Sequence, residues 1–566
     1  MDNYQVADCF SLLARLMDIH GENSFKAKSY SIAAFTIEKL PVQLSEIPLD
    51  KLSAIKGIGE STGKKIMELM STGTLGVLKE MVDKTPPGIL EMLNIKGIGP
   101  KKIATIWKEM EIESIGELLY ACKENRLKLY KGFGEKTQHN VTETIEYYLK
   151  SQGSYLYRDA ELIAPVILSL LKGLFTEGVE ITGSYTRQME FVNELEFVIN
   201  AGADDMELRL STIPGFEIKQ KNKDEITCNS PYGIQLKLYS STPELFIKNI
   251  FRHTNSPEFA NAFEINYPDI DYTSCRKTED IFLQAAISFI PAYARENANI
   301  ISKAKNNILP EVIQPEDIKG IIHCHSNWSD GNNTIEEMAL AAMEKGMEYL
   351  VISDHSKSAF YAQGLSEERI KEQHHYICEL NEKYKQWNGT RKPFKIFRSI
   401  ECDILNDGKL DYPDAILTTF DLVITSVHAN LKMTEEKAMM RLLGAIENPY
   451  TTILGHMTGR LLLSRKGYPV DHKLIIDACA QNQVAIELNA HPNRLDMDWR
   501  HIEYALEKKV MISIDPDAHS IEGFNDTRYG VLVAQKGLLA KDQNLSSLGL
   551  IEFENYLEDR KRVKKI

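Results

Sequence analysis

Seven short apolar runs, each of strand length and each followed by polar residues, recur through the second half of this 566-residue chain. Helix-like segments separate the runs, so the pattern predicts parallel strands that alternate with helices in a β/α barrel. The runs end as Gly-Ile-Ile-His-Cys-His at 325, Tyr-Leu-Val-Ile-Ser-Asp-His at 355, Phe-Arg-Ser-Ile-Glu at 401, Leu-Val-Ile-Thr-Ser-Val-His at 428, Thr-Thr-Ile-Leu-Gly-His at 456, Val-Ala-Ile-Glu-Leu-Asn at 489 and Val-Met-Ile-Ser-Ile-Asp-Pro-Asp-Ala-His at 519.

Six of these seven runs finish in a side chain that can bind a metal. Strand ends converge on one face of a β/α barrel, so residues far apart in sequence would line one pocket. One such residue alone is more often a core histidine or a helix cap, but a full set at corresponding strand ends indicates a metal site. Imidazoles and carboxylates together suit zinc, manganese or iron, and nine ligands imply two or three ions. The candidate metal ligands are His323, His325, Asp330, His355, Glu401, His428, His456, Asp517 and His519.

Composition limits the classes of protein that remain. The length predicts roughly three to five domains. The start of the chain has no basic-plus-apolar signal segment, and no run approaches the ~20 apolar residues that span a bilayer, so we expect a cytoplasmic protein without membrane contact. Eight cysteines without a CxxC pair fit reduced thiols. The net charge of −14 means that nucleic acid would be held by local basic patches.

The histidines divide the chain. Eleven of the fourteen lie at or beyond position 323. The polar, proline-containing sequence NNILPEVIQPEDIKG precedes that point and reads as a connector between two halves that fold independently.

The front half contains a repeated glycine motif. Ile55-Lys56-Gly57-Ile58-Gly59 recurs as Ile95-Lys96-Gly97-Ile98-Gly99, and Lys131-Gly132-Phe133-Gly134 is a weaker third copy. The glycines let the backbone turn so that amides at a helix N-terminus face a phosphate oxygen, which is the helix-hairpin-helix signature. A tight helix turn without a ligand is the alternative, but downstream lysines favour binding of the DNA backbone. The predicted DNA-binding residues are Gly57, Gly59, Gly97, Gly99, Lys64, Lys65, Lys101 and Lys102.

Farther along, a second constellation could bind a nucleotide. Ser184 and Arg187 precede an alternating strand-like run in which Glu194 and Glu196 share one face. Such carboxylates could hold two divalent cations while Ser184 and Arg187 contact a triphosphate. The same alternation is also ordinary for a half-buried strand.

These motifs, with Phe25-Lys26-Ala27-Lys28 and the stretch TPPGILEMLNIKGIGPKK, make residues 1–305 resemble a bacterial family X DNA polymerase. The resemblance implies mainly α helix-hairpin-helix domains, then an α+β nucleotidyltransferase-like palm and thumb, with three palm aspartates on two magnesium ions. Here Glu194 and Glu196 match the first two, and Lys237 stands where the third is implied. The stretch from Phe251 to Ser256 also replaces an aromatic-plus-glycine motif of the thumb.

These departures predict that nucleotide addition is impaired or absent, and we expect no dependable Mg²⁺ site in the palm. Each glutamate carries an extra methylene, in a site where a misplacement of about 1 Å costs roughly 10²-fold in rate. Lys237 repels divalent cations. The alternative is a working gap-filling polymerase in which Glu190 supplies the third carboxylate and a dNTP still binds. Lys65 matches a lyase Schiff-base lysine of relatives, although Ser61 replaces the neighbouring phosphate-binding lysine.

The second half resembles the PHP (polymerase and histidinol phosphatase) phosphoesterase domain. The segments HCHSNWSDG, SDHS, IECDILNDG, SVH, LGHMTGR and DPDAH match its metal motifs, and all nine ligand positions are filled. The resemblance implies two or three Mn²⁺ or Zn²⁺ ions and 3′→5′ exonuclease or related end-trimming activity. Lys432 and Arg460 are expected to contact phosphate. The residues expected to be catalytic are His323, His325, Glu401, Asp517 and His519.

The sequence therefore predicts a multidomain, monomeric DNA-repair protein that acts on gapped duplexes, 3′ ends and 5′ phosphates. A small-molecule phosphatase with inert front domains is a further alternative. The expected segments are a lyase-like helix-hairpin-helix domain at 1–80, fingers at 81–150, palm at 151–240, thumb at 241–305, linker at 306–319 and, at 320–566, a PHP domain with a distorted seven-stranded α/β barrel.

Overall fold

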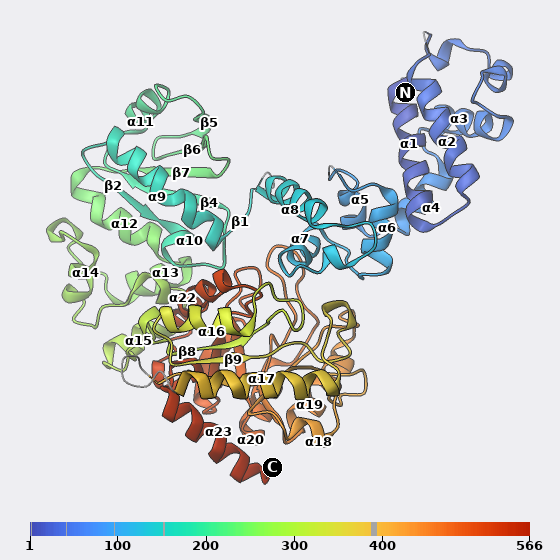
Figure 1. The fold of residues 1–566 in the computed structure, drawn as a ribbon. Helices are drawn as coiled ribbons and strands as arrows, with labels where there is room; N and C mark the ends of the chain where they lie inside the picture. The colour runs from blue at the N-terminus through green and yellow to red at the C-terminus, as the bar shows by residue number, and fades with distance from the viewer. Residues whose placement is uncertain (2, 41, 96, 151–152, 386–392) are drawn as a thin grey trace. The chain divides into compact units, whose positions relative to one another are not determined.

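A computed structural model describes residues 1, 3–40, 42–95, 97–150, 153–385 and 393–566. The chain forms two compact units, Met1–Tyr148 and Leu149–Ile566. The expectation that the chain folds as independent halves on either side of residues 306–319 is therefore wrong, because that connector lies inside the second unit. Figure 1 shows the first in blue and cyan and the second from cyan-green to red. Among the described helices, none is both long and apolar enough to cross a membrane.

The described elements of the first unit are all helical, and glycines make its turns. Gly57, Gly97 and Gly132 have φ of 100°, 93° and 94°, a backbone conformation that side chains with a Cβ rarely adopt. The three motif copies therefore share one turn geometry; Lys96 of the second copy lies outside the described residues. The helices are α1 (Asn3–His20), α2 (Ser24–Glu38), α3 (Glu60–Thr72), α4 (Gly76–Asp83), α5 (Pro87–Met92), α6 (Pro100–Lys108), α7 (Ile115–Lys123) and α8 (Glu135–Lys150).

The second unit begins with a five-stranded mixed sheet of order β2-β4-β7-β6-β5. Apolar side chains of β4 and β7 alternate with Glu194, Glu196 and Lys237, and pack against α9. In the register, Glu196 lies directly opposite Lys237 on the parallel neighbour. The bounds are α9 (Tyr157–Leu174), β2 (Val179–Thr182), α10 (Gly183–Thr186), β4 (Glu194–Ile199), α11 (Ala203–Leu210), β5 (Glu217–Lys221), β6 (Glu225–Asn229) and β7 (Gln235–Ser240).

Short helices follow this sheet and surround a buried arginine. Arg295 is 2% exposed, and its guanidinium lies 4.8–5.5 Å from the ring centres of Phe251, Phe282 and Phe289. The rings replace water around the cation, so this arginine serves packing. The helices are α12 (Phe246–Thr254), α13 (Pro257–Asn266), α14 (Thr278–Gln284) and α15 (Asn299–Lys305).

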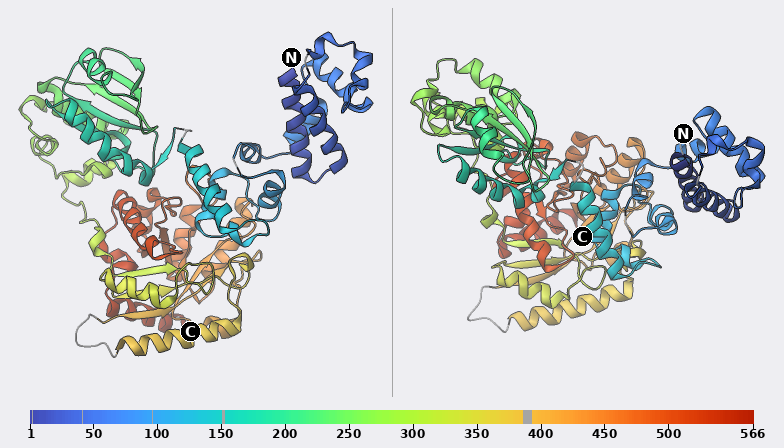
Figure 2. Two further views of the ribbon diagram at one scale, coloured as in Figure 1. Left: turned by 45° about the horizontal axis from the view of Figure 1, so that its top comes forward. Right: turned by 90° about the horizontal axis from the view of Figure 1, so that it is seen from above.

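The described part of the remaining chain contains eight parallel strands in two sheets, of order β10-β9-β8 and β11-β12-β13-β14-β15. Figures 1 and 2 show helices such as α16 and α17 outside the strands β8 and β9. The strands are β8 (Gly320–Cys324), β9 (Tyr349–Ile352), β10 (Lys395–Arg398), β11 (Glu401–Asp403), β12 (Val423–Ser426), β13 (Thr451–Leu454), β14 (Ala485–Asn489) and β15 (Ile512–Asp515). The helices are α16 (Ile335–Glu344), α17 (Glu367–Lys385), α18 (Asp414–Leu417), α19 (Glu435–Glu447), α20 (His472–Asn482), α21 (Ile502–Glu507), α22 (Thr527–Lys536) and α23 (Leu550–Lys564).

The third apolar run, expected as one strand, is two strands. Ser399 N donates to Ile352 O, whereas Ile400 O accepts from Ile424 N, so the chain leaves β9 and joins β12 at this point. Because the pairing strand changes within this one run, seven apolar runs give eight strands, and these strands form two sheets rather than one sheet. At the other edge, an isolated bridge pairs Cys324 with Ala518, beyond the end of β15.

Ion pairs and hydrogen bonds join the mixed-sheet region to the parallel sheets within this unit. Lys536, at the end of α22, has a fully buried side chain and donates to Glu296 Oε1 at 3.0 Å. It also donates to the carbonyls of Arg187 at 2.8 Å and Tyr293 at 3.2 Å. Arg528 pairs with Glu161 in the same interface. A buried ammonium with three acceptors is stable only while all of them stay in place.

We predict that Lys536→Met lowers the free energy of unfolding of the 149–566 unit by about 2–4 kcal/mol, because two carbonyls and a carboxylate lose their buried donor. Chemical denaturation of the full chain measures the change. Lys541→Ala is the matched control, since that lysine side chain is 63% exposed and lies 3.8 Å from Asp317. A Lys536→Met variant as stable as the control would contradict the inferred buried contact.

Candidate metal centre

The nine candidate ligands converge in the second unit, at the C-terminal ends of the parallel strands. His323 and Glu401 lie on β8 and β11, and the others lie in the segments that follow β8, β9, β12, β13 and β15. The parallel direction brings these ends together although the residues span 323–519. The side chains of all nine are at most 10% exposed.

Among the described residues of the second unit, three groups of donor atoms could each hold an ion. His325, Asp330, His355 and His519 form the first, His323, His325 and Asp517 the second, and His355, Glu401 and His428 the third. Within each group the donor atoms lie within 4.8 Å of one another. His325 belongs to two groups and so does His355, so adjacent ions would share a ligand residue.

Glu401 is the centre of the arrangement. Its Oε1 lies 3.0 Å from Nε2 of both His428 and His456, and its Oε2 lies 3.0 Å from His355 Nδ1. Three imidazoles from different strands thus face one buried carboxylate. His456, which belongs to none of the three groups above, joins the site through this contact.

Several buried atoms that could bind a metal make no contact of hydrogen-bond geometry with the described residues, although Glu401 Oε2 lies 3.0 Å from His355 Nδ1. They include both oxygens of Asp330, Glu401 Oε2 and His323 Nε2. Each such atom costs about 1–3 kcal/mol when it is buried and unsatisfied. A bound cation would satisfy all of them at once, so the donor set fits a cluster of metal ions.

The pKa shifts of the candidate ligands also fit a cluster of metal ions. Burial alone would lower the pKa of His355, but the carboxylates of Asp330 and Glu401 outweigh burial and raise it to about 10. Burial is likewise outweighed at His428, where Glu401 and Asp403 raise the pKa to about 9. The pKa of Glu401 is held well below its ordinary value by its histidine neighbours despite complete burial. Ionised carboxylates therefore face protons that metal ions can replace.

Two carboxylates outside the predicted set of metal ligands contact Nδ1 of two candidate ligand histidines. His428 Nδ1 lies 3.0 Å from Asp403 Oδ1, and His323 Nδ1 lies 2.6 Å from Glu487 Oε2. In metal sites such contacts fix the ring orientation and the tautomer. The signal in the sequence was present: Asp403 lies two residues after Glu401, and Glu487 lies in the one apolar run without a ligand.

Of the two expected phosphate contacts, Arg460 is committed elsewhere. It donates to Asp498 Oδ2 at 2.7 Å and to the carbonyls of Arg494 and Leu495. These bonds occupy the guanidinium, so the expectation for Arg460 is wrong for this conformation. Lys432 is exposed in the loop after His428.

The expected polymerase residues lie together on the mixed sheet. Glu196 is folded against α10, because a Cβ on Gly183 would lie 2.0 Å from Glu196 Oε1. Its Oε2 accepts from the Tyr239 hydroxyl at 2.8 Å. Lys237 Nζ lies 3.6 Å from Glu225 Oε2. Burial, the Glu196 charge and other neighbours raise the pKa of Glu194, although Lys237 lowers it.

The residues expected to contact a triphosphate differ in their surroundings. Arg187 pairs with Glu296 at 3.0 Å and donates to Thr254 O, so its guanidinium is engaged. Ser184 lies half-buried on α10. Glu190, considered as a substitute carboxylate, is 3% exposed and accepts from Arg500 at 3.3 Å.

The predicted DNA-binding residues lie at two hairpins of the first unit. Gly59 and Gly99 are the N-caps of α3 and α6, and neither helix has a side-chain cap. The first backbone amides of these helices are thus available to a phosphate. The lysines differ: Lys64 and Lys101 are exposed, Lys65 is half-buried, and Lys102 is half-buried with its Nζ 5.5 Å from the Phe133 ring centre. Lys64 also lies 3.3 Å from Glu60 Oε1.

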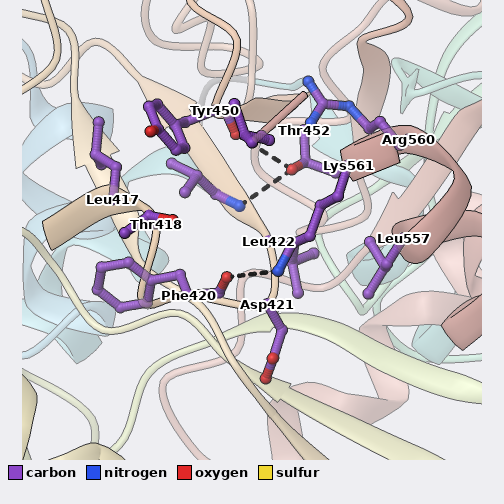
Figure 3. Close-up of a pocket in the computed structure, with 12 residues that line it drawn as sticks. Leu417, Thr418, Phe420, Asp421, Leu422, Tyr450, Thr452, Leu557, Arg560 and Lys561 are labelled. Atoms are coloured by element: carbon purple, nitrogen blue, oxygen red, sulfur yellow. Dashed lines mark hydrogen bonds between the residues drawn. The ribbon is translucent and has the colours of Figure 1, made fainter. Parts of the chain in front are cut away.

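One cavity of this unit lies apart from the candidate ligands. A cavity of about 130 Å³ opens beside α23, lined by Leu417, Phe420, Tyr450, Leu557, Arg560 and Lys561 among others (Figure 3). It lies near the N-terminal ends of β12 and β13, opposite to the ends that carry the ligands. Its lysine is engaged, since Lys561 Nζ donates to Phe420 O at 2.9 Å.

Comparisons with known proteins match both units. A helix-hairpin-helix domain family matches residues 1–75, a SAM-like helix-hairpin-helix tandem matches 89–146, and the PHP domain family matches 322–491. The chain is 30% identical over 567 residues to the DNA polymerase/3′-5′ exonuclease PolX of Bacillus subtilis, with 96% of this chain and 97% of the relative covered. The chain belongs to the family X DNA polymerases that carry a PHP domain.

Shorter similarities reach proteins of another description. A probable phosphatase of Caldicellulosiruptor bescii is 30% identical over 171 residues, which cover 30% of this chain and 63% of that protein. A probable phosphatase of Thermoanaerobacter sp. is 24% identical over 240 residues, which cover 41% and 90%. This family X chain is thus similar to a polymerase-exonuclease along its whole length and to phosphatases along part of it.

We predict that metal loading releases at least two protons between pH 7 and 8.5. His355 and His428, with pKa values of about 10 and about 9, are protonated there without metal and must be neutral to bind it. The apparent affinity for Mn²⁺ should therefore rise ~100-fold per pH unit, ~10-fold for each proton. Titration calorimetry in buffers of different ionisation enthalpy counts the protons, and binding without proton release would contradict the prediction.

The same shifts set the pH dependence of the metal-free protein. Because the folded pKa values exceed the ordinary value near 6.5, these pairs contribute their full stability below about pH 6.5 and lose it as pH rises through about 9–10. The thermal unfolding midpoint of the chelator-treated protein should therefore fall as pH rises through that window. Added metal should reduce this fall in the midpoint.

Proposed function

We propose that this chain acts mainly as a metal-dependent 3′→5′ exonuclease or phosphodiesterase on DNA. The observation that carries the proposal is the convergence of nine buried candidate ligands, Glu401 among them, at the C-terminal ends of the parallel strands, in a family X chain whose PHP match includes most of them. The full-length relative is described as both a polymerase and a 3′-5′ exonuclease. Of these two activities, the residues of this chain favour the second.

The PHP residues have two proposed roles, metal binding and contact with phosphate. His323, His325, Glu401, Asp517 and His519, together with Asp330, His355, His428 and His456, would hold two or three Mn²⁺ or Zn²⁺ ions. When bound, such ions supply Lewis acidity and a nucleophilic hydroxide near neutral pH, and neutralise charge that develops on a phosphodiester. The protein holds the donors at fixed positions and excludes bulk water from them. Lys432, exposed beside His428, remains a proposed phosphate contact.

We infer that the two parallel sheets act as one distorted barrel with seven strand positions. The supporting contacts are the bridge between Cys324 and Ala518 and that between His355 and Glu401, which pair strand ends across the two sheets. Ligands from both sheets then face one pocket.

Nucleotide addition is proposed to be impaired or absent. Two observations support this: Lys237, which replaces an expected carboxylate, places a cation near Glu225, and Arg187, expected to contact a triphosphate, is paired with Glu296. A divalent ion at Glu194 and Glu196 would have to overcome repulsion by Lys237. Glu190 offers no replacement carboxylate in this conformation, because it accepts from Arg500.

The first unit is proposed to deliver DNA, in the form of gapped duplexes, 3′ ends and 5′ phosphates, to a monomeric enzyme. Its support is the pair of hairpins with uncapped helix N-termini. Within the two units, the finer division into residues 1–80, 81–150, 151–240, 241–305, 306–319 and 320–566 stays a proposal. Lyase chemistry at half-buried Lys65 would be detected by borohydride trapping.

Two other functions are distinguishable. A gap-filling polymerase with PHP proofreading would extend a primer. A small-molecule phosphatase, which the partial similarity to probable phosphatases favours, would turn over without any contribution from the hairpins.

We predict that the full chain shortens a 5′-labelled primer on a gapped duplex with Mn²⁺ and four dNTPs. The double variant His323→Ala, His325→Ala should slow shortening by at least ~10²-fold, because it loses two candidate ligands, of which His325 is shared between two donor groups. Gel electrophoresis of the primer follows both reactions. The double variant also separates synthesis from degradation: an unchanged primer supports impaired synthesis, and an extended primer would show that the polymerase works.

We also predict that Lys64→Ala combined with Lys101→Ala weakens DNA binding and flattens its salt dependence. If each lysine neutralises one phosphate, the slope of log K against log salt falls by about 2. Fluorescence anisotropy at several salt concentrations measures the slope. Lys79→Ala, on the exposed surface of α4, is the control. A phosphatase that uses no hairpin would keep its turnover of a small phosphate ester in both the double variant and the control.

A further inference from the structure

Strand β14 is exceptional, because its run alone supplies no candidate metal ligand. Ile486 and Leu488 are fully buried in the outer apolar cluster, so the alternating residues Glu487 and Asn489 face the interior. Both polar side chains are also fully buried. Two polar groups at such a position need partners, and their partners are ligands from neighbouring strands.

Glu487 uses both carboxylate oxygens. Oε2 lies 2.6 Å from His323 Nδ1, and Oε1 accepts from the His456 backbone N–H at 3.2 Å and from Asn489 Nδ2 at 2.8 Å. One carboxylate on β14 therefore touches two ligand residues, from β8 and from the segment after β13. Since both oxygens are engaged, Glu487 is not itself placed as a tenth ligand.

Asn489 extends the contacts to a third ligand. Its Oδ1 accepts from the His491 N–H at 3.1 Å, which orients the amide so that Nδ2 faces two carboxylates. Nδ2 donates to Asp517 Oδ2 at 3.0 Å as well as to Glu487. Asp517 Oδ1 then remains directed towards His325 Nε2, 3.1 Å away.

We propose that Glu487 and Asn489 are positioning residues for the metal cluster: they orient His323, His456 and Asp517, and they fix the His323 tautomer whose Nε2 faces the ions. The proposal rests on the proposed metal site and assigns β14 a role within it. His323 Nδ1 must carry the proton to donate to Glu487, which leaves the Nε2 lone pair for a metal. His323 Nε2 lies 3.4 Å from Glu401 Oε1 and 3.5 Å from Asp517 Oδ1, among the other donors.

The neighbouring strand leaves room for this arrangement. Gly455 faces the same interior, where an added Cβ would lie 3.5 Å from Glu487 Oε2 and 2.3 Å from Ser426 Oγ. A side chain there would clash with Ser426, whereas its Cβ would lie at an ordinary contact distance from Glu487. Glycine at the residue before His456 is thus required by Ser426 and is compatible with the inward carboxylate of Glu487.

The chemistry of Glu487 requires two accepting oxygens, so Glu487→Gln is the informative change. Glutamine keeps the volume but has one accepting oxygen. If its amide NH₂ faces His323, the ring must move its proton to Nε2 and lose the metal-facing lone pair. If the NH₂ instead faces the His456 backbone N–H and Asn489 Nδ2, three N–H donors point towards one another and none of them has an acceptor there.

The test uses the full chain freed of metal with a chelator and titrated with Mn²⁺ by calorimetry. We expect Glu487→Gln to weaken Mn²⁺ binding by ~10–100-fold, and Asn489→Leu, which removes the donor to Asp517 at similar volume, to weaken it to a comparable extent. Asp421→Asn is the matched control. That carboxylate pairs with Arg398 at 2.8 Å near the start of β12, away from the ligands, and its loss should leave Mn²⁺ affinity unchanged.

A second readout separates positioning from a merely structural role. Histidine-selective ¹⁵N NMR of the Zn²⁺ form should show a protonated Nδ1 for His323 in wild type, and Glu487→Gln should alter that signal alone among the ligand histidines or broaden it. Glu487→Asp keeps two accepting oxygens on a shorter side chain and should retain more affinity than Glu487→Gln.

The outcomes are distinct. If wild type binds Mn²⁺ and Glu487→Gln binds it equally well with an unchanged His323 signal, the positioning role is overturned while the metal site stands. If wild type itself binds neither Mn²⁺ nor Zn²⁺, the proposed function fails together with this inference. Loss of affinity in both β14 variants, with Asp421→Asn unchanged, supports it even if one variant is less stable.

Discussion

The contact of three histidines with the buried carboxylate of Glu401 is the interaction on which the C-terminal architecture depends. A fully buried carboxylate is costly unless cations or donors surround it. Here His355, His428 and His456 supply that environment from three separate strand ends. The strands must therefore end at one level, and the sheets must curve enough to bring those ends together. The apolar packing beneath them provides the stability that the polar cluster lacks.

The sequence predicted that the candidate ligands follow the strand ends, because periodicity and chemistry coincide there; that they bind metal stays a prediction. Apolar runs define buried strands, and a polar side chain at a strand end has few structural uses, so His428 or His456 can be recognised without coordinates. Contacts across strands are different in kind. The pairing of Glu487 with His323 depends on the register of β14 against its neighbours, which no local pattern specifies. Arg460 was assigned wrongly for the same reason, since only tertiary structure brings it to Asp498 and Arg494 O.

The break in the third run shows a related limit. Residues 397–401 have the composition of one strand, yet Ser399 pairs with β9 and Ile400 with β12. Hydrophobicity reports burial and not the choice of partner, so it cannot reveal where a strand changes sheets. The hairpin glycines were easier to interpret, because a positive φ at Gly57, Gly97 and Gly132 is a local demand that the residue type itself records.

The two sites of this family X chain solve the same electrostatic problem in opposite ways. In the mixed sheet, a lysine on the adjacent strand supplies a permanent positive charge beside Glu194, Glu196 and Glu225, so the carboxylates are partly neutralised without metal. In the parallel sheets, histidines that can lose their protons surround the carboxylates, so positive charge can be exchanged for metal ions. A fixed cation favours a stable fold at the expense of metal binding, whereas exchangeable protons keep a site ready for metal. That difference, rather than the number of acidic residues, is the physical reason to place the chemistry in the PHP domain.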